Sequence, residues 1–195
     1  YYSREQWDTT LIWLNNEVKG QTAKGEAMIP SLKALQAIHE RRGDNLVVAT
    51  MTGRQEWHSM STSPAQDMAL NSMGKASSFG LGLALAQPER KVIVLDGDGS
   101  LTMNLNTFVT IGGKRPANMI HIVLENGGFL HTGGEPIAGA GVSSFPEMAK
   151  GAGYVSSHEY DNLEAFVSDL DGIFAEKGPV FICLHVEHDP MPRVQ

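Results

Sequence analysis

The sequence contains a single cysteine, Cys183, in a chain of 195 residues. One thiol cannot form an intrachain disulfide, and it cannot build a four-thiolate zinc or iron–sulfur centre. Cys183 lies in the apolar run Phe181-Ile182-Cys183-Leu184, which favours a small buried side chain. A domain of this length can bury enough surface to fold without a disulfide bond.

Basic residues are also scarce: 15 Lys and Arg stand against 22 Asp and Glu, a formal charge of −7. The one tight basic cluster is Arg41-Arg42, so we expect no nucleic-acid partner and no attachment to an anionic membrane. No apolar run approaches the ~20 residues that a bilayer span needs. The segment from Tyr1 to Trp7 carries charge where a signal peptide would have an apolar core. We therefore expect a cytoplasmic globular protein.

Short apolar runs alternate with helical patterns along the chain. Strands are expected at 46–49, 91–95, 119–124, 154–157 and 179–186. Helices are expected at 29–42, 74–87, about 100–112, 145–153 and 163–175. This alternation predicts an α/β fold, a parallel sheet with helices on both faces. We interpret residues 50–71 as a long functional loop, 1–28 as an N-terminal arm or helix, and 29–195 as the folded domain.

Glycine is abundant, with 21 residues, and two glycine-rich segments follow expected strands. In the first, Asp98 stands between Gly97 and Gly99, where the backbone can approach a ligand and present its N–H groups. Such a loop favours an anion, and a carboxylate inside it would repel a phosphate unless a divalent cation lay between them. Mg²⁺ fits, because it prefers oxygen ligands and often joins carboxylates to phosphates.

The second glycine-rich segment begins at Asn126, after the next expected strand. The carboxyl ends of parallel strands meet at one edge of a sheet, where ligands bind. Asn126 offers an amide oxygen there, and the pair Gly127-Gly128 leaves a main-chain carbonyl free to turn inward. Together with Asp98, phosphate oxygens and water, these groups could complete an octahedron around Mg²⁺.

The segments Gly97-Asp98-Gly99-Ser100 and Asn126-Gly127-Gly128-Phe129 resemble the thiamine diphosphate and magnesium signature of thiamine-dependent enzymes. With the segment Asn71-Ser72-Met73-Gly74, the stretch from about 47 to 145 is similar to the diphosphate-binding domain of the decarboxylase and acetolactate-synthase group. The likeness is greatest to phosphonopyruvate decarboxylases and to the beta subunits of sulfopyruvate decarboxylases. The resemblance implies the thiamine diphosphate-binding fold, with thiamine diphosphate and Mg²⁺ as cofactors.

The resemblance also implies roles for single residues. Asp98, the side chain of Asn126 and the main-chain oxygen of Gly128 would bind Mg²⁺. The further cofactor contacts that it implies are Gly53, Asn71, Met73, Gly97, Gly99 and Ser100. Of these, Gly99 and Ser100 would hold the diphosphate, Met73 would support the bent cofactor, and the main-chain oxygen of Asn71 would accept from its 4′-amino group.

The implied reaction is the non-oxidative decarboxylation of a small 2-oxo acid to an aldehyde. A sulfonate or phosphonate on the substrate would need cationic partners, for which Lys75, His131 and Arg54 are the local candidates. His131 follows Gly128 by three residues, so we take it as the candidate catalytic proton-transfer group. His58 is a weaker candidate.

Two further residues near these motifs are not expected to act in the reaction. His121, inside an apolar run, is expected to be structural. Glu125 stands where the family usually has a second asparagine.

Members of this group use a glutamate on a separate pyrimidine-binding domain to activate the cofactor. The chain has only about 45 residues before its first expected strand, too few for a second α/β domain. Glu56 and Glu125 both lie within the diphosphate-binding half and do not match that position. We therefore expect an alpha-type partner subunit that carries the pyrimidine-binding domain and the activating glutamate, with a fragment of a longer chain as the competing explanation.

The sequence argues against two other functions and leaves two open. The run Gly80-Leu81-Gly82-Leu83-Ala84 resembles a dinucleotide fingerprint, but it lies inside an expected helix, where glycine favours close packing. A 2-oxoacid ferredoxin oxidoreductase needs a cysteine cluster that Cys183 alone cannot build. An acetolactate synthase-like carboligase subunit and a non-catalytic scaffold subunit that retains the fold both stay open.

Overall fold

The computed structural model describes residues 28–61 and 63–187. Its main sheet has seven parallel strands in the order β1-β9-β5-β4-β2-β3, and β8 also pairs with β9. The strands are β1 (Ile29–Pro30), β2 (Leu46–Thr50), β3 (Asp67–Leu70), β4 (Val92–Gly97), β5 (Met119–Glu125), β8 (Ser156–Tyr160) and β9 (Val180–Glu187). A separate antiparallel pair joins β6 (Gly128–Phe129) to β7 (Glu135–Pro136).

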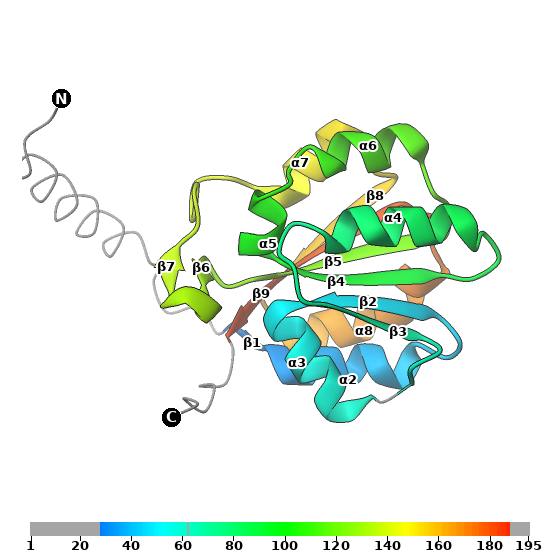
Figure 1. Cartoon of the computed structure of the whole chain (residues 1–195), viewed down its shortest axis with the longest axis horizontal. Coiled ribbons are helices and arrows are strands. Elements are labelled where there is room, and N and C mark those ends of the chain that lie inside the picture. The colour runs from blue at the N-terminus through cyan, green and yellow to red at the C-terminus, as the bar shows by residue number, and fades with distance from the viewer. Residues whose placement is uncertain (1–27, 62, 188–195) are drawn as a thin grey trace, which may run out of the picture.

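Helices cover both faces of this sheet (Figure 1). One face carries α2 (Ser31–Arg41), α3 (Met51–Met60) and α8 (Leu163–Ala175). The other carries α4 (Ala76–Ala86), α5 (Asp98–Thr102), α6 (Thr107–Lys114) and α7 (Phe145–Ala152). The expected parallel α/β fold with helices on both faces is confirmed. Residues 1–27 of the expected N-terminal arm lie outside the described residues.

The central strand β4 shows how the two cores are divided. Ile93 and Leu95 face the layer of α8, where Phe166 is also fully buried. Val92 and Val94 face the opposite layer, with Phe108 of α6. Because both faces are covered, the strand is apolar throughout rather than alternating, which made it recognisable in the sequence.

Residues 50–71 do not form a long loop, so that expectation was wrong. They contain α3 and β3, which pairs with β2 along its length. The carboxylate of Asp67 holds this region together by accepting from Arg42 Nη1 at 2.7 Å, Trp57 Nε1 at 3.0 Å and Ser61 Oγ at 2.7 Å. This polar segment is thus held in place by hydrogen bonds to a buried carboxylate. Such contacts require no periodic apolar residues, so the sequence shows no helix or strand pattern here.

Several other boundaries also differ from expectation. The first helix begins at Ser31, because Ile29 and Pro30 pair with the end of β9. The helix expected at about 100–112 is divided, since α5 ends at Thr102 and α6 begins at Thr107. The expected strand 154–157 lies at 156–160. The glycine-rich segment that begins at Asn126 contains β6, the 3₁₀ turn η1 (Leu130–Thr132) and β7.

Gly80 has the packing role expected for it. A Cβ atom there would lie 2.2 Å from Val94 Cγ2, so α4 can approach β4 only with glycine at this position. Gly82 differs, because a Cβ atom at that residue would meet nothing within 4 Å. The Gly-Leu-Gly run is therefore explained by packing at its first glycine only.

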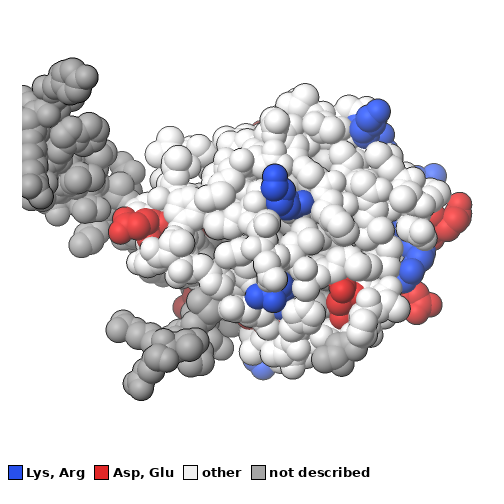
Figure 2. Space-filling view, viewed as in Figure 1, with Lys and Arg blue, Asp and Glu red and all other residues white. Residues whose placement is uncertain are grey.

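None of the described helices is long and apolar enough to cross a bilayer. Figure 2 shows that Lys and Arg on the viewed face of the described residues are scattered and do not gather into one basic patch.

Candidate active site

A pocket opens at the carboxyl ends of β2, β4 and β5. Its lining comes from four segments of the chain: 50–53, Met73, 97–100, and a fourth from 124 to 132. The lining residues are Thr50, Met51, Thr52, Gly53, Met73, Gly97, Asp98, Gly99, Ser100, Leu124, Asn126, Gly128, Phe129, Leu130, His131 and Thr132. The strand ends that the sequence singled out therefore meet in one place.

Asp98 is buried at the start of α5, with 2% of its surface exposed. Its Oδ1 accepts from the backbone N–H of Gly99 at 2.6 Å. Its Oδ2 accepts from the backbone N–H groups of Asn126 at 3.0 Å and Gly127 at 2.7 Å. Three hydrogen bonds fix the orientation of the carboxylate. Oδ2 accepts two of them, whereas Oδ1 accepts one and retains a lone pair that can bind a cation.

The electrostatics of Asp98 also favour a cation. Burial raises the pKa of this carboxyl group to about 6, although the N–H groups of Gly127, Gly99 and Asn126 lower it. The charge of Glu125 raises the pKa further. A divalent cation bound at Asp98 would favour the ionised carboxylate and offset the cost of burying it.

Asn126 turns its loop in the manner of an Asx turn: its Oδ1 accepts from the backbone N–H of Gly128 at 2.8 Å. Gly127, between them, has φ +77°, a conformation that L side chains rarely adopt. The expected ligand atoms on Asn126 and Gly128 thus belong to one tight turn. The backbone N–H groups of Asn126 and Gly127 connect this turn to Asp98 by hydrogen bonds.

The third expected motif is tied to the same loop. The backbone N–H of Gly74 donates to Ser100 Oγ at 2.9 Å, and Asn104 Nδ2 donates to the carbonyl of Gly74 at 2.8 Å. Met73, just before Gly74, lines the pocket. The hydroxyl hydrogen of Ser100 is not used in the bond with Gly74, so it remains able to donate to a ligand.

The turn from β2 into α3 is a part of the pocket that the sequence indicated only through Gly53. Met51 has φ +51°, which is strained for a side chain other than glycine. Thr50 supports this turn, with its hydroxyl near the carbonyl oxygens of Leu70 at 3.3 Å and Ser72 at 3.2 Å. Gly53 was the one signal at this turn; a Cβ atom there would lie 3.1 Å from Leu124 Cδ1.

Most of the site residues expected from the sequence line the pocket. Nine of them do so: Gly53, Met73, Gly97, Asp98, Gly99, Ser100, Asn126, Gly128 and His131. Asn71 is exposed and does not line it. His131 is exposed in η1 at the mouth of the pocket, whereas Arg54, His58 and Lys75 are not among the lining residues.

Two side chains expected to be structural, His121 and Cys183, are buried and also have polar contacts. His121 has no exposed surface and its Nδ1 lies 3.1 Å from the hydroxyl of Tyr154, while its Nε2 lies 3.7 Å from Asp96 Oδ2, beyond hydrogen-bond distance. Cys183 is fully buried as expected, but its Sγ donates to Glu125 Oε2 at 2.9 Å.

The donor set at the pocket fits a magnesium-bound diphosphate. Asp98 and Asn126 supply hard oxygen ligands of the kind that Mg²⁺ takes. Gly99 is a close-fitting part of the wall, since a Cβ atom there would lie 2.6 Å from Phe129 Cδ1. Gly97 also lines the pocket, and a Cβ atom at that position would meet nothing within 4 Å, so a ligand can approach the backbone there.

A parallel sheet with a glycine-lined pocket at its strand ends defines the class of α/β proteins that bind ligands at that edge. Within this class, residues 43–184 match the family described as "Thiamine pyrophosphate enzyme, C-terminal TPP binding domain". The chain belongs to this family.

Named relatives agree with the family. The chain is 38% identical over 157 residues to the sulfopyruvate decarboxylase subunit beta of Methanothermobacter thermautotrophicus, covering 79% of this chain and 80% of that protein. It is 34% identical over 169 residues to the phosphonopyruvate decarboxylase of Streptomyces viridochromogenes, covering 86% of this chain and 41% of that protein. The resemblance to these two groups is confirmed. The chain spans less than half the length of the phosphonopyruvate decarboxylases that it matches.

The fold has solved counterparts. The thiamine diphosphate-dependent 4-hydroxybenzoylformate decarboxylase of Rhodococcus jostii RHA1 superposes with a TM-score of 0.70 at 20% sequence identity. The match covers 86% of this chain and 34% of that one. At this identity the likeness establishes the fold.

Proposed function

We propose that this chain is the beta-type subunit of a thiamine diphosphate- and Mg²⁺-dependent 2-oxo acid decarboxylase. The observation that carries the proposal is the Asp98 carboxylate, held by the backbone of Asn126 and Gly127 in a glycine-lined pocket. Asp98, the amide oxygen of Asn126 and the carbonyl of Gly128 would hold Mg²⁺, which binds the diphosphate. Thiamine diphosphate, when bound, supplies the nucleophilic carbon and the electron sink for decarboxylation.

The remaining pocket residues would position the reactants. Gly97, Gly99 and Ser100 would contact the diphosphate, and Met73 would support the cofactor from the neighbouring segment. His131, at the mouth of the pocket, would move a proton to or from the reacting group. The substrate that we propose is a small 2-oxo acid with a sulfonate or phosphonate group, because the named relatives act on sulfopyruvate and phosphonopyruvate. The product would be the corresponding aldehyde.

The partner that we propose is an alpha-type subunit carrying the pyrimidine-binding domain and its activating glutamate. Among the described residues, Asp98 is the one carboxylate that lines the pocket, and its role toward Mg²⁺ leaves no second acid for the cofactor. The chain also covers 80% of a relative that is itself named as a subunit. Exposed apolar side chains around the start of α6, Met103 (60% exposed) and Val109 (69%), are the kind that a partner covers.

The test is a carbon dioxide release assay with the chain alone and mixed with its alpha-type partner, in thiamine diphosphate and Mg²⁺. Sulfopyruvate, phosphonopyruvate and an aliphatic 2-oxo acid serve as substrates. We expect carbon dioxide and an aldehyde only with the partner, and faster turnover of the anionic substrates. A rate unchanged by the partner would overturn the subunit role. A condensation product in place of the aldehyde would favour the carboligase, and no cofactor binding in either state would favour the scaffold.

A further inference from the structure

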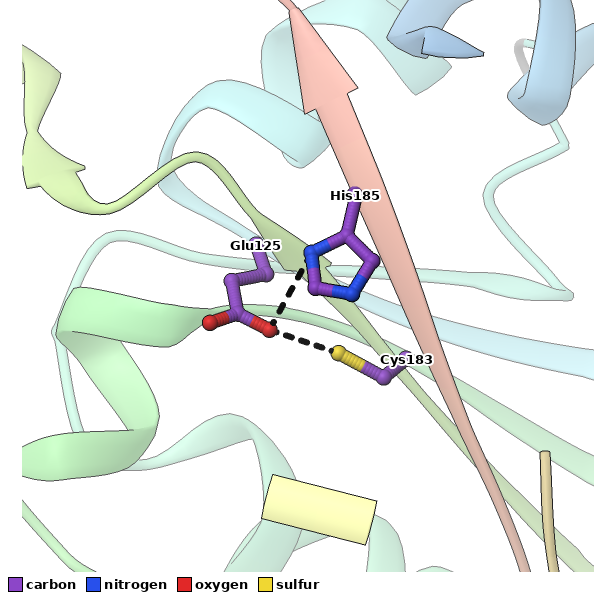
Figure 3. A group of neighbouring side chains, drawn as sticks. All are labelled: Glu125, Cys183 and His185. Atoms are coloured by element: carbon purple, nitrogen blue, oxygen red, sulfur yellow. Dashed lines mark hydrogen bonds and ion pairs between the residues drawn. The ribbon is translucent and has the colours of Figure 1, made fainter. Parts of the chain in front are cut away.

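Three side chains of types that can bind metals, Glu125, Cys183 and His185, gather on one face of β5 and β9 (Figure 3). Cys183 and His185 are two positions apart on β9, so their side chains point to the same face. Glu125, the last residue of β5, pairs directly with His185 in the parallel register. Strand geometry alone therefore brings a thiol, an imidazole and a carboxylate together.

The ligand atoms of these side chains already lie close to one another. Glu125 Oε2 is 2.9 Å from Cys183 Sγ and 3.6 Å from His185 Nδ1. All three atoms lie within 4.8 Å of one another. Zinc–ligand bonds of about 2.0–2.3 Å place tetrahedral ligand atoms at comparable separations, so only small side-chain movements would be needed.

A fourth side chain orients the histidine. Glu159 of β8 pairs with Cys183 in the register, and its Oε1 lies 2.8 Å from His185 Nε2. A proton on Nε2 donated to Glu159 leaves the lone pair on Nδ1, the nitrogen that faces Glu125. Metal-bound histidines usually show this arrangement, in which a carboxylate fixes the tautomer from the far side of the ring.

The electrostatic field at the cluster favours a cation. Burial raises the pKa of the Cys183 thiol well above its usual range, and the charges of Glu125, Glu159 and Asp98 raise it further. A divalent ion bound at the cluster would displace the thiol proton to solvent and would neutralise the surrounding carboxylates.

We propose that Glu125, Cys183 and His185 bind one Zn²⁺ ion. Sulfur, imidazole nitrogen and carboxylate oxygen are the donors that zinc takes in proteins, and a water molecule would complete the tetrahedron. The thiolate and imidazole select against Mg²⁺, which requires oxygen ligands. This site shares no ligand with the proposed magnesium site and does not depend on the proposed decarboxylase activity.

The test is a titration of the full chain, stripped of metal by a chelator, with Co²⁺ as the spectroscopic probe and with Zn²⁺ as the competitor. Cys183 is the only cysteine in the sequence, so a thiolate-to-cobalt charge-transfer band can come from no other residue. We expect this band to saturate at one equivalent of Co²⁺ and to disappear on addition of one equivalent of Zn²⁺. Zn²⁺ should also raise the unfolding temperature, because the site exists only in the folded chain.

Variants then assign the ligands. Cys183→Ser should abolish the cobalt band and the thermal shift. His185→Ala should weaken Zn²⁺ binding by at least about a hundredfold, and Glu159→Gln by about 10–100-fold with the band retained. His58→Ala, at an exposed histidine outside the cluster, is the matched control and should change neither the cobalt band nor the Zn²⁺ affinity. Circular dichroism of each variant without metal reports whether it folds.

Two results would overturn the proposal. The first is saturation with Co²⁺ without a charge-transfer band in the unmodified chain, a measurement that needs no variant. The second is an unchanged Zn²⁺ affinity in folded Cys183→Ser or His185→Ala.

Discussion

Asp98 Oδ2 accepts the backbone N–H of Asn126 at 3.0 Å, although Asn126 lies 28 positions later in the sequence. Two of the three expected magnesium ligands are therefore joined by a hydrogen bond that needs no ion. Asp98 has two separable roles as a result: it organises the Asn126 loop through hydrogen bonds, and it provides the negative charge for a cation. An informative substitution must remove the charge and still leave an oxygen acceptor.

Asp98→Asn meets that requirement. We expect it to weaken thiamine diphosphate binding by at least about a hundredfold at saturating Mg²⁺, because loss of a direct ligand exceeds the 10–100-fold cost of losing an outer partner. The amide NH₂ must also face an N–H donor of the loop, so the free energy of unfolding should fall by about 1–3 kcal/mol. Calorimetric titration with and without Mg²⁺ measures the first effect. Asp161→Asn, at an exposed residue, is the control; Mg²⁺-dependent affinity retained in Asp98→Asn would contradict the metal assignment.

The two glycines beside Asp98 separate protein packing from ligand approach. Gly99→Ala should destabilise the fold, because its Cβ would lie 2.6 Å from Phe129 Cδ1 and must displace that ring. Gly97→Ala should leave stability unchanged, since Gly97 has φ −100° and nothing lies within 4 Å of a Cβ there. If the diphosphate approaches Gly97, this variant should nonetheless bind the cofactor at least tenfold more weakly. Denaturant unfolding and calorimetric titration of both variants measure the two effects. Unchanged affinity in Gly97→Ala would remove that residue from the cofactor contacts.

The features best predicted from the sequence are the helices and strand ends that depend on neighbouring residues in the chain. The helix expected at 163–175 forms with those bounds, because its apolar residues recur at helical spacing and Asn162 Oδ1 accepts the N–H of Ala165 to cap it. The ends of β4 and β5 were predictable to within two residues, because glycine clusters after apolar runs mark where a parallel sheet presents its backbone to ligands.

What the sequence could not predict depends on distant contacts. The region around Asp67 folds because Arg42, 25 residues earlier, satisfies its charge, and no local pattern signals that pair. Met51 contributes a strained backbone to the pocket, but methionine is not a residue type that predicts a positive φ. The thiol of Cys183 meets Glu125 only through the register of β5 and β9, so the single cysteine looked like a simple apolar residue.

Gly80 and Gly82 form a matched pair within α4. Gly82→Ala should stabilise the protein by up to about 1 kcal/mol, because alanine is the better helix former and nothing lies within 4 Å of its Cβ. Gly80→Ala should destabilise it by about 1–3 kcal/mol despite the same gain in helix propensity, because its Cβ would overlap Val94 in the core. Thermal unfolding of the two variants measures the difference. Equal effects at both positions would show that α4 does not depend on close contact with β4.

The buried ion pair of Asp67 and Arg42 predicts a pH dependence of stability. The two side chains are 4% and 7% exposed, and the nitrogen and oxygen lie 2.7 Å apart. Burial raises the pKa of Asp67, but the hydrogen bonds from Trp57, Ser61 and Ser63 and the charge of Arg42 outweigh it, so the pKa lies below its usual value of 3.8. The ionised carboxylate therefore stabilises the fold fully above about pH 4, and this contribution is lost as the pH falls through the folded-state pKa.

Asp67→Asn should accordingly lower the free energy of unfolding by about 3–5 kcal/mol at neutral pH, because it leaves Arg42 buried without its counter-charge. The difference from the unmodified protein should shrink as the pH falls below about 4. Asp171→Asn is the matched control: Asp171 also binds an arginine, Arg41, at 2.8 Å, but its side chain is 77% exposed, so its loss should cost about 0–1 kcal/mol. Urea unfolding between pH 3 and 7 measures both variants. A loss for Asp67→Asn that stays constant over this range would mean that packing, not the charge of Asp67, holds β3 to the rest of the sheet.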